Sequence, residues 1–264
     1  MPGVERKEIY LNIAVCVKHV PDPNLPMEMD GNRLKRVGVQ GVLDPGDEFG
    51  VEAALQIKEG LGAEVTLVSM GPEASSEALR RGLSMGADRA ILVSDDALEG
   101  ADALATARVL QRAIERTQPD VVVAAVESTD GYTGTMPASL AQLMGWPQVT
   151  FATQVEITDR ILRAHRQTAT GYQVVECELP VVVTVTAGIN EPRYASFKGI
   201  MAAKKKPLER LTLADLGLSA ADVRPAQEIV ELSKAEECRS GEVIVDEGDA
   251  ATRVAAFLRE AKVI

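Results

Sequence analysis

The chain has 264 residues, of which 46% are apolar, 25% are charged and only 3% are aromatic. These values are typical of a globular domain and exclude a disordered or low-complexity chain, and so few aromatic side chains argue against a stacking platform for single-stranded nucleic acid. The 39 acidic residues outnumber the 28 basic ones, and the net charge of −11 disfavours binding to nucleic acid or anionic lipid.

Cysteine and histidine usage argues against a disulfide framework and against a metal centre. The chain has three widely spaced cysteines (Cys16, Cys177 and Cys238), no CxxC pair and only two histidines. No apolar run approaches the roughly 18 residues of a membrane span. The first residues, MPGVERKEIY, lack the apolar segment of a signal peptide. We therefore expect a cytoplasmic protein without a bound metal.

The first half of the chain alternates apolar strands with helical segments. Residues 11–17 form a continuous apolar run, which is typical of a strand buried on both faces. Residues 21–41 are rich in Pro and Gly and predict an irregular excursion with a short hairpin. Further elements are expected as helices at 44–61, 73–84 and 101–117 and as strands at 64–69, 90–93 and 120–126. This alternation predicts βαβ units and a parallel sheet.

After Trp146 and Pro147 the pattern changes to strands joined by tight turns. We expect strands at 153–158, 161–167, 172–178 and 179–186, with a hairpin tip at 158–160. Residues 190–206 predict a loop and a short helix, with Phe197 in the loop, and residues 218–237 predict a polar connector. Residues 250–261 predict an amphipathic helix with one apolar face formed by Val254, Phe257 and Leu258.

The predicted fold is therefore α/β: a Rossmann-like parallel sheet with flanking helices, an added β-hairpin region and a C-terminal arm. We expect the α/β domain to span residues 1–235 and the arm to span residues 236–264.

Three loops are expected at the carboxyl ends of parallel strands, where open sheets bind their ligands. They span residues 44–47, 69–72 and 127–135. The third precedes a predicted helix and combines backbone amides freed by Gly131 and Gly134 with four hydroxyls, those of Ser128, Thr129, Thr133 and Thr135. Hydroxyls and amides at a helix N-terminus suit a phosphate group, and an ordinary N-capped loop is the alternative.

Several catalytic and nucleotide motifs are absent from the sequence. It contains no GxGxxG, GxxxxGK[ST] or GxSxG, and neither His19 nor His165 has a nucleophile partner. The chain is thus a poor candidate for an enzyme with catalytic side chains of its own. A Lys204–Lys206 run and an isolated Phe197 in a polar stretch instead predict a docking surface, with a merely solvated face as the alternative.

The sequence from residue 175 to residue 206 carries a long motif. It reads Val175-Glu176-Cys177-Glu178-Leu179-Pro180, then N-E-P-R-Y-A-S-F-K-G-I-M over 190–201, then Lys204–Lys206. This arrangement resembles the signature of electron transfer flavoprotein beta subunits, including the nitrogen-fixation-associated branch. The resemblance covers nearly the whole chain and continues in Val17-Lys18 with Val20–Asp22, Asp44–Glu48, Gly82–Asp88, Glu127–Gly131 and the closing Phe257–Ile264.

The resemblance implies an obligate heterodimer with an alpha subunit that holds most of the redox FAD. The beta chain would then be part of an electron carrier, not an enzyme. It would form a nucleotide-binding domain that holds AMP, or a second FAD in electron-bifurcating members. The implied nucleotide residues are Cys16, Asp44, Pro45, Gly46, Asp47, Met70, Glu127, Ser128, Thr129, Asp130, Gly131, Tyr132, Thr133, Gly134 and Thr135.

The same resemblance implies that residues 190–206 anchor partner dehydrogenases, with Phe197 where many members have Leu. The complex would accept electrons from flavin dehydrogenases such as the acyl-CoA dehydrogenases of fatty acid oxidation and pass them to a membrane-bound quinone oxidoreductase. The C-terminal arm would pack on the flavin domain of the alpha subunit. The implied docking residues are Asn190, Pro192, Arg193, Tyr194, Ser196, Phe197, Lys198, Ile200, Met201, Lys204, Lys205 and Lys206.

Two departures from the family pattern leave both AMP and FAD open for this subunit. Gly46 stands where some members have an aromatic residue, and residues 127–131 differ from the acidic loop of mitochondrial-type members. The alternative functions are a bifurcating subunit that uses NADH and a free-standing adenine-nucleotide-binding regulator. The apolar face of the C-terminal helix argues against the regulator, because a protein that works alone has no use for it.

Overall fold

The computed structural model describes residues 10–233, 243 and 245–264. The chain divides into two compact units, Met1–Val230 and Glu231–Ile264. The domain boundary expected at residues 235 and 236 lies outside the described residues, as does Cys238. In the described ranges no helix has the length and apolar character needed to cross a membrane.

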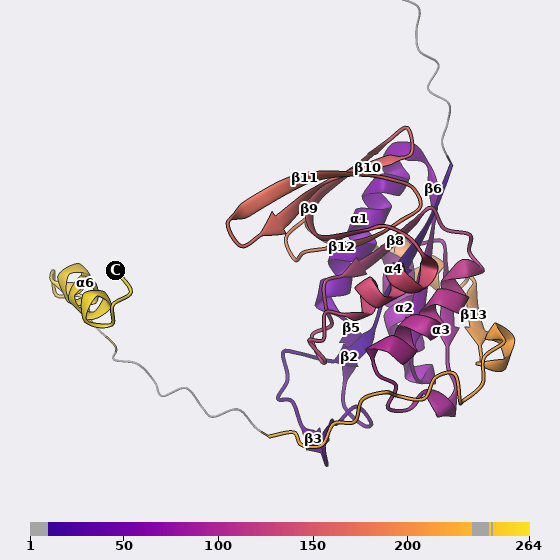
Figure 1. Ribbon diagram of the computed structural model, residues 1–264, viewed down its shortest axis with the longest axis horizontal. Helices are drawn as coiled ribbons and strands as arrows, with labels where there is room; N and C mark the ends of the chain where they lie inside the picture. Colours follow the sequence, from indigo (N-terminus) through magenta and orange to yellow (C-terminus); the bar gives the residue numbers. More distant parts are fainter. Residues whose placement is uncertain (1–9, 234–242, 244) are drawn as a thin grey trace, which may run out of the picture. The chain divides into compact units, whose positions relative to one another are not determined.

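The larger unit is built on a nine-stranded sheet with the order β11-β10-β9-β12-β8-β1-β6-β7-β13 (Figure 1). Every neighbouring pair from β9 to β13 is parallel, and β10 and β11 extend the sheet with antiparallel pairs at the β9 end. The strands are β1 (Leu11–Cys16), β6 (Ala63–Met70), β7 (Arg89–Val93), β8 (Val121–Ala125), β9 (Gln148–Thr158), β10 (Ile161–Thr168), β11 (Gly171–Glu178), β12 (Val181–Val185) and β13 (Leu208–Leu211).

The excursion after β1 holds two small antiparallel pairs. Strand β2 (His19–Pro21) pairs with β5 (Gly41–Leu43), and β3 (Met29–Asp30) pairs with β4 (Arg33–Leu34). The short hairpin predicted within residues 21–41 is therefore confirmed.

Helices cover both faces of the sheet. Side chains of α1, α2 and α5 pack into one buried cluster with one face of the sheet, and those of α3 and α4 pack into a second cluster with the other face. The helices of this unit are α1 (Pro45–Leu61), α2 (Ser76–Met85), α3 (Ala103–Glu115), α4 (Met136–Met144) and α5 (Phe197–Ala203), with short 3₁₀ turns at Glu73–Ser75, Asp96–Leu98 and Ala214–Leu216.

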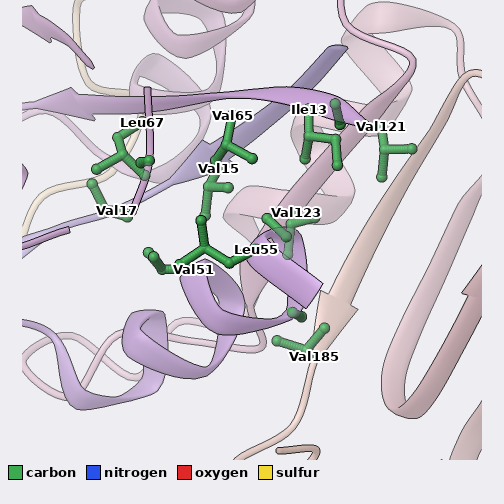
Figure 2. Close-up of a cluster of buried hydrophobic side chains, with 14 of the residues drawn as sticks. Ile13, Val15, Val17, Val51, Leu55, Val65, Leu67, Val121, Val123 and Val185 are labelled. Carbon is green, nitrogen blue, oxygen red and sulfur yellow. The ribbon is translucent and has the colours of Figure 1, made fainter. Parts of the chain in front are cut away.

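The continuous apolar run of β1 follows from this layering. Ile13 and Val15 point into the cluster with α1, whereas Ala14 and Cys16 point into the cluster with α3 and α4. Figure 2 shows Val51 and Leu55 of α1 near the aliphatic side chains of the sheet. Each fully buried Val or Leu contributes about 1.5–3 kcal/mol, so a core with few aromatic residues needs many such side chains.

The predicted α/β fold is confirmed, with three local differences. Strand β13 is missing from the sequence prediction because it is a four-residue edge strand whose middle residues, Glu209 and Arg210, are exposed and charged. Strand β9 begins five residues earlier than expected, because an irregularity at Phe151 (φ 58°) interrupts the alternation of exposed and buried residues. Phe197 is the first residue of α5, whereas the sequence suggested a loop position before the helix.

The smaller unit contains one helix, α6 (Ala250–Glu260), among its described residues. The apolar residues predicted on one face of this helix are not buried in the chain, and Val254 and Phe257 are 44% and 65% exposed.

The strand order fixes where the sheet can bind a ligand. From β1 the chain proceeds to β6 and β7 on one side, and it returns to β8 on the other side of β1. The carboxyl ends of β1 and β8 therefore flank the switch point of the sheet, which is the position where open α/β sheets bind ligands.

Candidate functional site

Asp44 connects the two loops at the switch point. Its carboxylate accepts the Gly46 N–H at 2.8 Å and so caps the N-terminus of α1, while its other oxygen accepts the backbone N–H (2.7 Å) and the hydroxyl (3.0 Å) of Thr129. The side chain is completely buried. A buried cap that also accepts two hydrogen bonds from a second loop fixes that loop to α1, because leaving such a buried acceptor unpaired is costly.

Asp47 lies on the first turn of α1, directly beneath the end of β1. It accepts the Lys18 N–H at 2.7 Å. Burial raises the pKa of this carboxyl well above its usual range, and the neighbouring Asp44 raises it further. Burial also raises the pKa of the Cys16 thiol to about 12, with a further contribution from Asp47. The Cys16 thiol is therefore an inert, protonated core group.

Asp130 in the loop after β8 carries two ion pairs. Lys18 Nζ lies 2.6 Å from one carboxylate oxygen and also donates to Ser128 Oγ at 3.2 Å, and Arg36 Nη2 lies 2.6 Å from the other oxygen. The Asp130 side chain is fully shielded from solvent. Burial opposes its ionisation, but the charge of Lys18 and the hydrogen bonds from Lys18 and Arg36 outweigh burial and lower the pKa of the carboxyl.

The second part of the same loop faces solvent. Residues 131–135 are exposed and lead into α4, which begins at Met136. No hydrogen bond occupies the backbone N–H groups of Thr133, Gly134 and Thr135 within the described chain. Gly134 has φ of 62°, a conformation that favours glycine. Unpaired amides at the start of a helix are suited to an anion.

The structure thus divides the predicted hydroxyls into two groups. Those of Ser128 and Thr129 are engaged in bonds to Lys18 and Asp44, whereas Thr133 and Thr135 remain exposed. Asp44 and Asp47 hold backbone groups and do not line a free surface. The exposed amides, not the carboxylates, are the groups available to a ligand.

Most of the residues implied for the nucleotide lie around this switch point. Cys16 ends β1, residues 44–47 open α1 and residues 127–135 follow β8, while Met70 ends β6, the neighbour of β1 on the same edge. Sequence analysis did not assign Lys18 and Arg36 to the site. The place of Lys18 directly after β1 could have indicated it, but Arg36 lies in the irregular excursion and gives no signal.

A second candidate surface lies at α5. Tyr194 and Phe197 are 91% and 81% exposed, and Ile200 and Met201 are about half exposed. We call these four residues the apolar patch. Exposed lysines surround it at positions 198, 204 and 205. A cluster of large exposed apolar side chains with a charged rim is typical of a protein-binding surface.

Lys206 differs from the two lysines that precede it. Its ammonium group donates to the carbonyl oxygens of Leu83 (3.0 Å) and Ala87 (2.5 Å), and burial lowers its pKa. Lys206 thus ties the segment to the end of α2, so only Lys204 and Lys205 of the run are free to meet a partner. A surface hollow of about 440 Å³ beside the contact of α5 with α2 is lined by Arg80, Arg81, Ser84, Ile200, Ala203 and Lys204.

Comparison with known proteins identifies the family. The family model of the electron transfer flavoprotein domain matches residues 32–216, more than half of the chain. The electron transfer flavoprotein subunit beta of Mycobacterium leprae is 39% identical over 264 residues, covering 96% of this chain and 99% of the relative. The chain belongs to the electron transfer flavoprotein family, as a beta subunit.

Two further relatives come from other bacteria. The electron transfer flavoprotein subunit beta of Thermoanaerobacterium thermosaccharolyticum is 40% identical, and the alignment covers 78% of this chain and 80% of the relative. The caffeyl-CoA reductase-Etf complex subunit CarD of Acetobacterium woodii is 40% identical, and the alignment covers 79% of this chain and 81% of the relative.

The expected family is thereby confirmed. This beta subunit is part of a flavin-related electron carrier and not an enzyme, and a beta subunit implies an alpha subunit as its partner.

Proposed function

We propose that this beta subunit works in a heterodimer that accepts electrons from flavin dehydrogenases, such as acyl-CoA dehydrogenases, and passes them to a membrane-bound quinone oxidoreductase. The observation that carries this proposal is the apolar patch, because an 81% exposed Phe197 beside a 91% exposed Tyr194 is expected only where another protein covers them. The redox chemistry is that of the flavin, which the alpha subunit mainly holds. This chain contributes by binding a nucleotide and by positioning the partner protein. We place the carrier in the cytoplasm.

The switch-point loop is proposed to hold an adenine nucleotide, AMP or the adenine half of a second FAD. The support is the set of unpaired amides of Thr133, Gly134 and Thr135 at the N-terminus of α4, which matches the needs of a phosphate group. Lys18 and Asp44 hold the loop in shape beneath them.

Nucleotide release tests the binding site directly. Denaturing the purified heterodimer should release about one adenine nucleotide per beta chain in addition to the FAD of the alpha chain. Replacing Gly134 by Val should lower that nucleotide content, because φ of 62° is strained for a β-branched residue. Gly145 is the matched control, because its φ of 67° lies at the other end of α4. A folded heterodimer that releases only the alpha-chain FAD would contradict the assignment.

A bifurcating carrier is the second candidate function. The Acetobacterium woodii relative is named as a subunit of a caffeyl-CoA reductase-Etf complex, so relatives at 40% identity include members of a reductase assembly. A bifurcating subunit needs a flavin in place of AMP, and the flavin count per heterodimer therefore separates the two candidates. Two FAD per heterodimer with NADH oxidation would favour bifurcation, and one FAD with one AMP favours the plain carrier.

The C-terminal arm is proposed to pack on the flavin domain of the alpha subunit. Its helix α6 exposes Val254 and Phe257, which a helix of a folded heterodimer is expected to bury. Deleting residues 245–264 should weaken heterodimer formation and flavin retention, as measured by co-purification and by the flavin absorbance. A truncated chain that pairs and retains FAD normally would remove the arm from the interface.

A further inference from the structure

The residues that precede the apolar patch have no regular secondary structure, yet they are firmly attached to α1. Asn190 Nδ2 donates to the carbonyl oxygen of Phe49 at 3.0 Å. The Arg193 backbone N–H donates to Glu52 at 3.2 Å, and its side chain reaches two glutamates of the same helix. A loop of this kind would otherwise sample many conformations. Holding it in one conformation costs conformational entropy, which these contacts offset.

The Arg193 guanidinium is held by two carboxylates at once. Nε and Nη2 donate to the two oxygens of Glu52 at 2.7 and 2.9 Å, and Nη1 and Nη2 donate to the two oxygens of Glu59 at 2.5 and 3.1 Å. The two glutamates are seven residues apart on α1, and a helix therefore presents them on one face. Glu52 is only 5% exposed in its side chain, so this is a partly buried double fork and not a loose surface pair.

The other end of the segment is fixed as well. Ser196 caps α5 by accepting the Gly199 N–H at 3.0 Å. A Cβ at Gly199 would lie 2.4 Å from the Ser84 carbonyl oxygen, so the absence of a side chain there lets α5 approach α2 closely. Arg80 donates to the carbonyl oxygens of Ala203 and Lys206. The apolar patch thus lies on a segment held at both ends by α1 and α2.

We propose that Arg193 is a positioning residue for partner docking, which rests on the docking role proposed above for the apolar patch. By bridging Glu52 and Glu59 it holds residues 190–196 in one conformation, so that Tyr194 and Phe197 are presented before a partner arrives. Pre-ordering removes the entropic cost of arranging the loop during association. The arginine itself is turned toward α1, and its proposed role requires no contact of its own with the partner.

A double-mutant cycle separates this role from ordinary structural support. The full heterodimer is assayed with an acyl-CoA dehydrogenase, reduced by its acyl-CoA, as the electron donor. Arg193→Met should raise the KM for the dehydrogenase roughly tenfold with an unchanged kcat. In a Phe197→Ala background the same change should raise KM by less than about twofold. The Phe197 side chain is then absent, so the loss of Arg193 can no longer displace it from the position that the partner binds. No hydrogen bond, ion pair or ring contact joins these two described side chains, so this coupling would arise through the loop.

Matched variants keep the test decisive. Arg193→Met with Glu52→Gln removes the unpaired buried carboxylate and should restore folding without restoring KM. Arg210→Met breaks a bidentate pair with Glu73 in which no residue of the 190–206 segment takes part, and it should leave KM unchanged. Hydrogen exchange of the residue 194–198 amides should speed up in Arg193→Met and not in Arg210→Met.

The outcomes distinguish this inference from the docking proposal. If Phe197→Ala alone leaves the KM unchanged, the docking proposal fails. If Phe197→Ala raises KM but Arg193→Met has no effect, or the two effects multiply independently, docking stands and the positioning role of Arg193 is overturned.

Discussion

The switch-point loop and the loop that leads into α5 are both irregular stretches held to α1 by acidic side chains, but they support surfaces with different chemical groups exposed to solvent. At the loop of residues 127–135, carboxylates lie inside and backbone amides face solvent. At the segment of residues 190–206, the ion pairs again lie inside, but large apolar side chains face solvent. The same kind of anchor therefore supports a surface suited to a small anion in one case and to a protein in the other.

The largest effect is expected from Asp44→Ala. This change removes the cap of α1 and both bonds to Thr129, and it should lower the free energy of unfolding by about 3 kcal/mol and release the nucleotide. Asp102→Ala is the matched control, because Asp102 caps α3 and likewise holds a second segment through the Ala226 N–H but makes no bond to the 127–135 loop, and it should cost about 1 kcal/mol and leave nucleotide content intact. Urea titration and nucleotide analysis measure both. Equal losses of unfolding free energy and of nucleotide in the two variants would show that Asp44 has no specific role at the nucleotide site.

Phe197→Ala should act on the partner and not on the fold. Burying this side chain in a partner should contribute about 2 kcal/mol, so its loss should raise the KM for the dehydrogenase roughly 30-fold. Thermal stability, flavin content and the flavin spectrum should not change, because Phe197 is 81% exposed. A lower melting temperature with unchanged dehydrogenase kinetics would instead identify Phe197 as a structural residue of α5.

Two of the buried carboxyls of the switch point, those of Asp130 and Asp47, should give opposite pH dependence. The lowered pKa of Asp130 means that its stabilising contribution is present above the unfolded pKa of about 3.9 and is lost as the pH falls. The raised pKa of Asp47 means that its contribution is present below about 3.9 and is lost as the pH rises through its folded pKa. The destabilisation by Asp130→Asn should therefore grow as the pH rises toward about 4, and that by Asp47→Asn should shrink above it. Urea midpoints across this range check the signs, and parallel profiles for the two variants would contradict them.

The smallest effect is expected from the exposed lysines beside the apolar patch. Lys204→Gln with Lys205→Gln should slow association with a dehydrogenase about twofold at low salt and have little effect at high salt, because rim charges act mainly on the encounter rate. Lys35→Gln is a control, because it pairs with the exposed Glu28 in the excursion after β1. The control removes one positive charge and the double variant removes two, so a loss about half as large in the control would mean that only net charge matters.

Sequence patterns predicted the elements that are buried on both faces far better than the contacts that build the site. The continuous apolar runs of β1, β8 and β12 identified the middle of the sheet, because a strand covered on both faces must be apolar throughout. Strand β13 was not predicted, because its exposed Glu209 and Arg210 interrupt any continuous apolar run.

At the site, the loops could be located because they follow the strands. The pairing of Asp130 with Arg36 could not, because 94 residues separate the two and no local pattern connects them. Likewise the sequence motif included Arg193 among the docking residues, but only the fold shows that its side chain is turned to Glu52 and Glu59.

The position of β1 and β8 in the middle of the sheet has a consequence for how the site opens. Amides of central strands exchange with solvent only when the whole domain unfolds, whereas exposed loops open at almost no cost in free energy. The strands beneath the site therefore belong to the slowest-exchanging part of the chain, whereas the exposed residues 131–135, which follow the anchored Asp130, belong to the fastest. A nucleotide bound at the proposed site would therefore enter and leave by motion of residues 131–135 while the sheet beneath it stays closed.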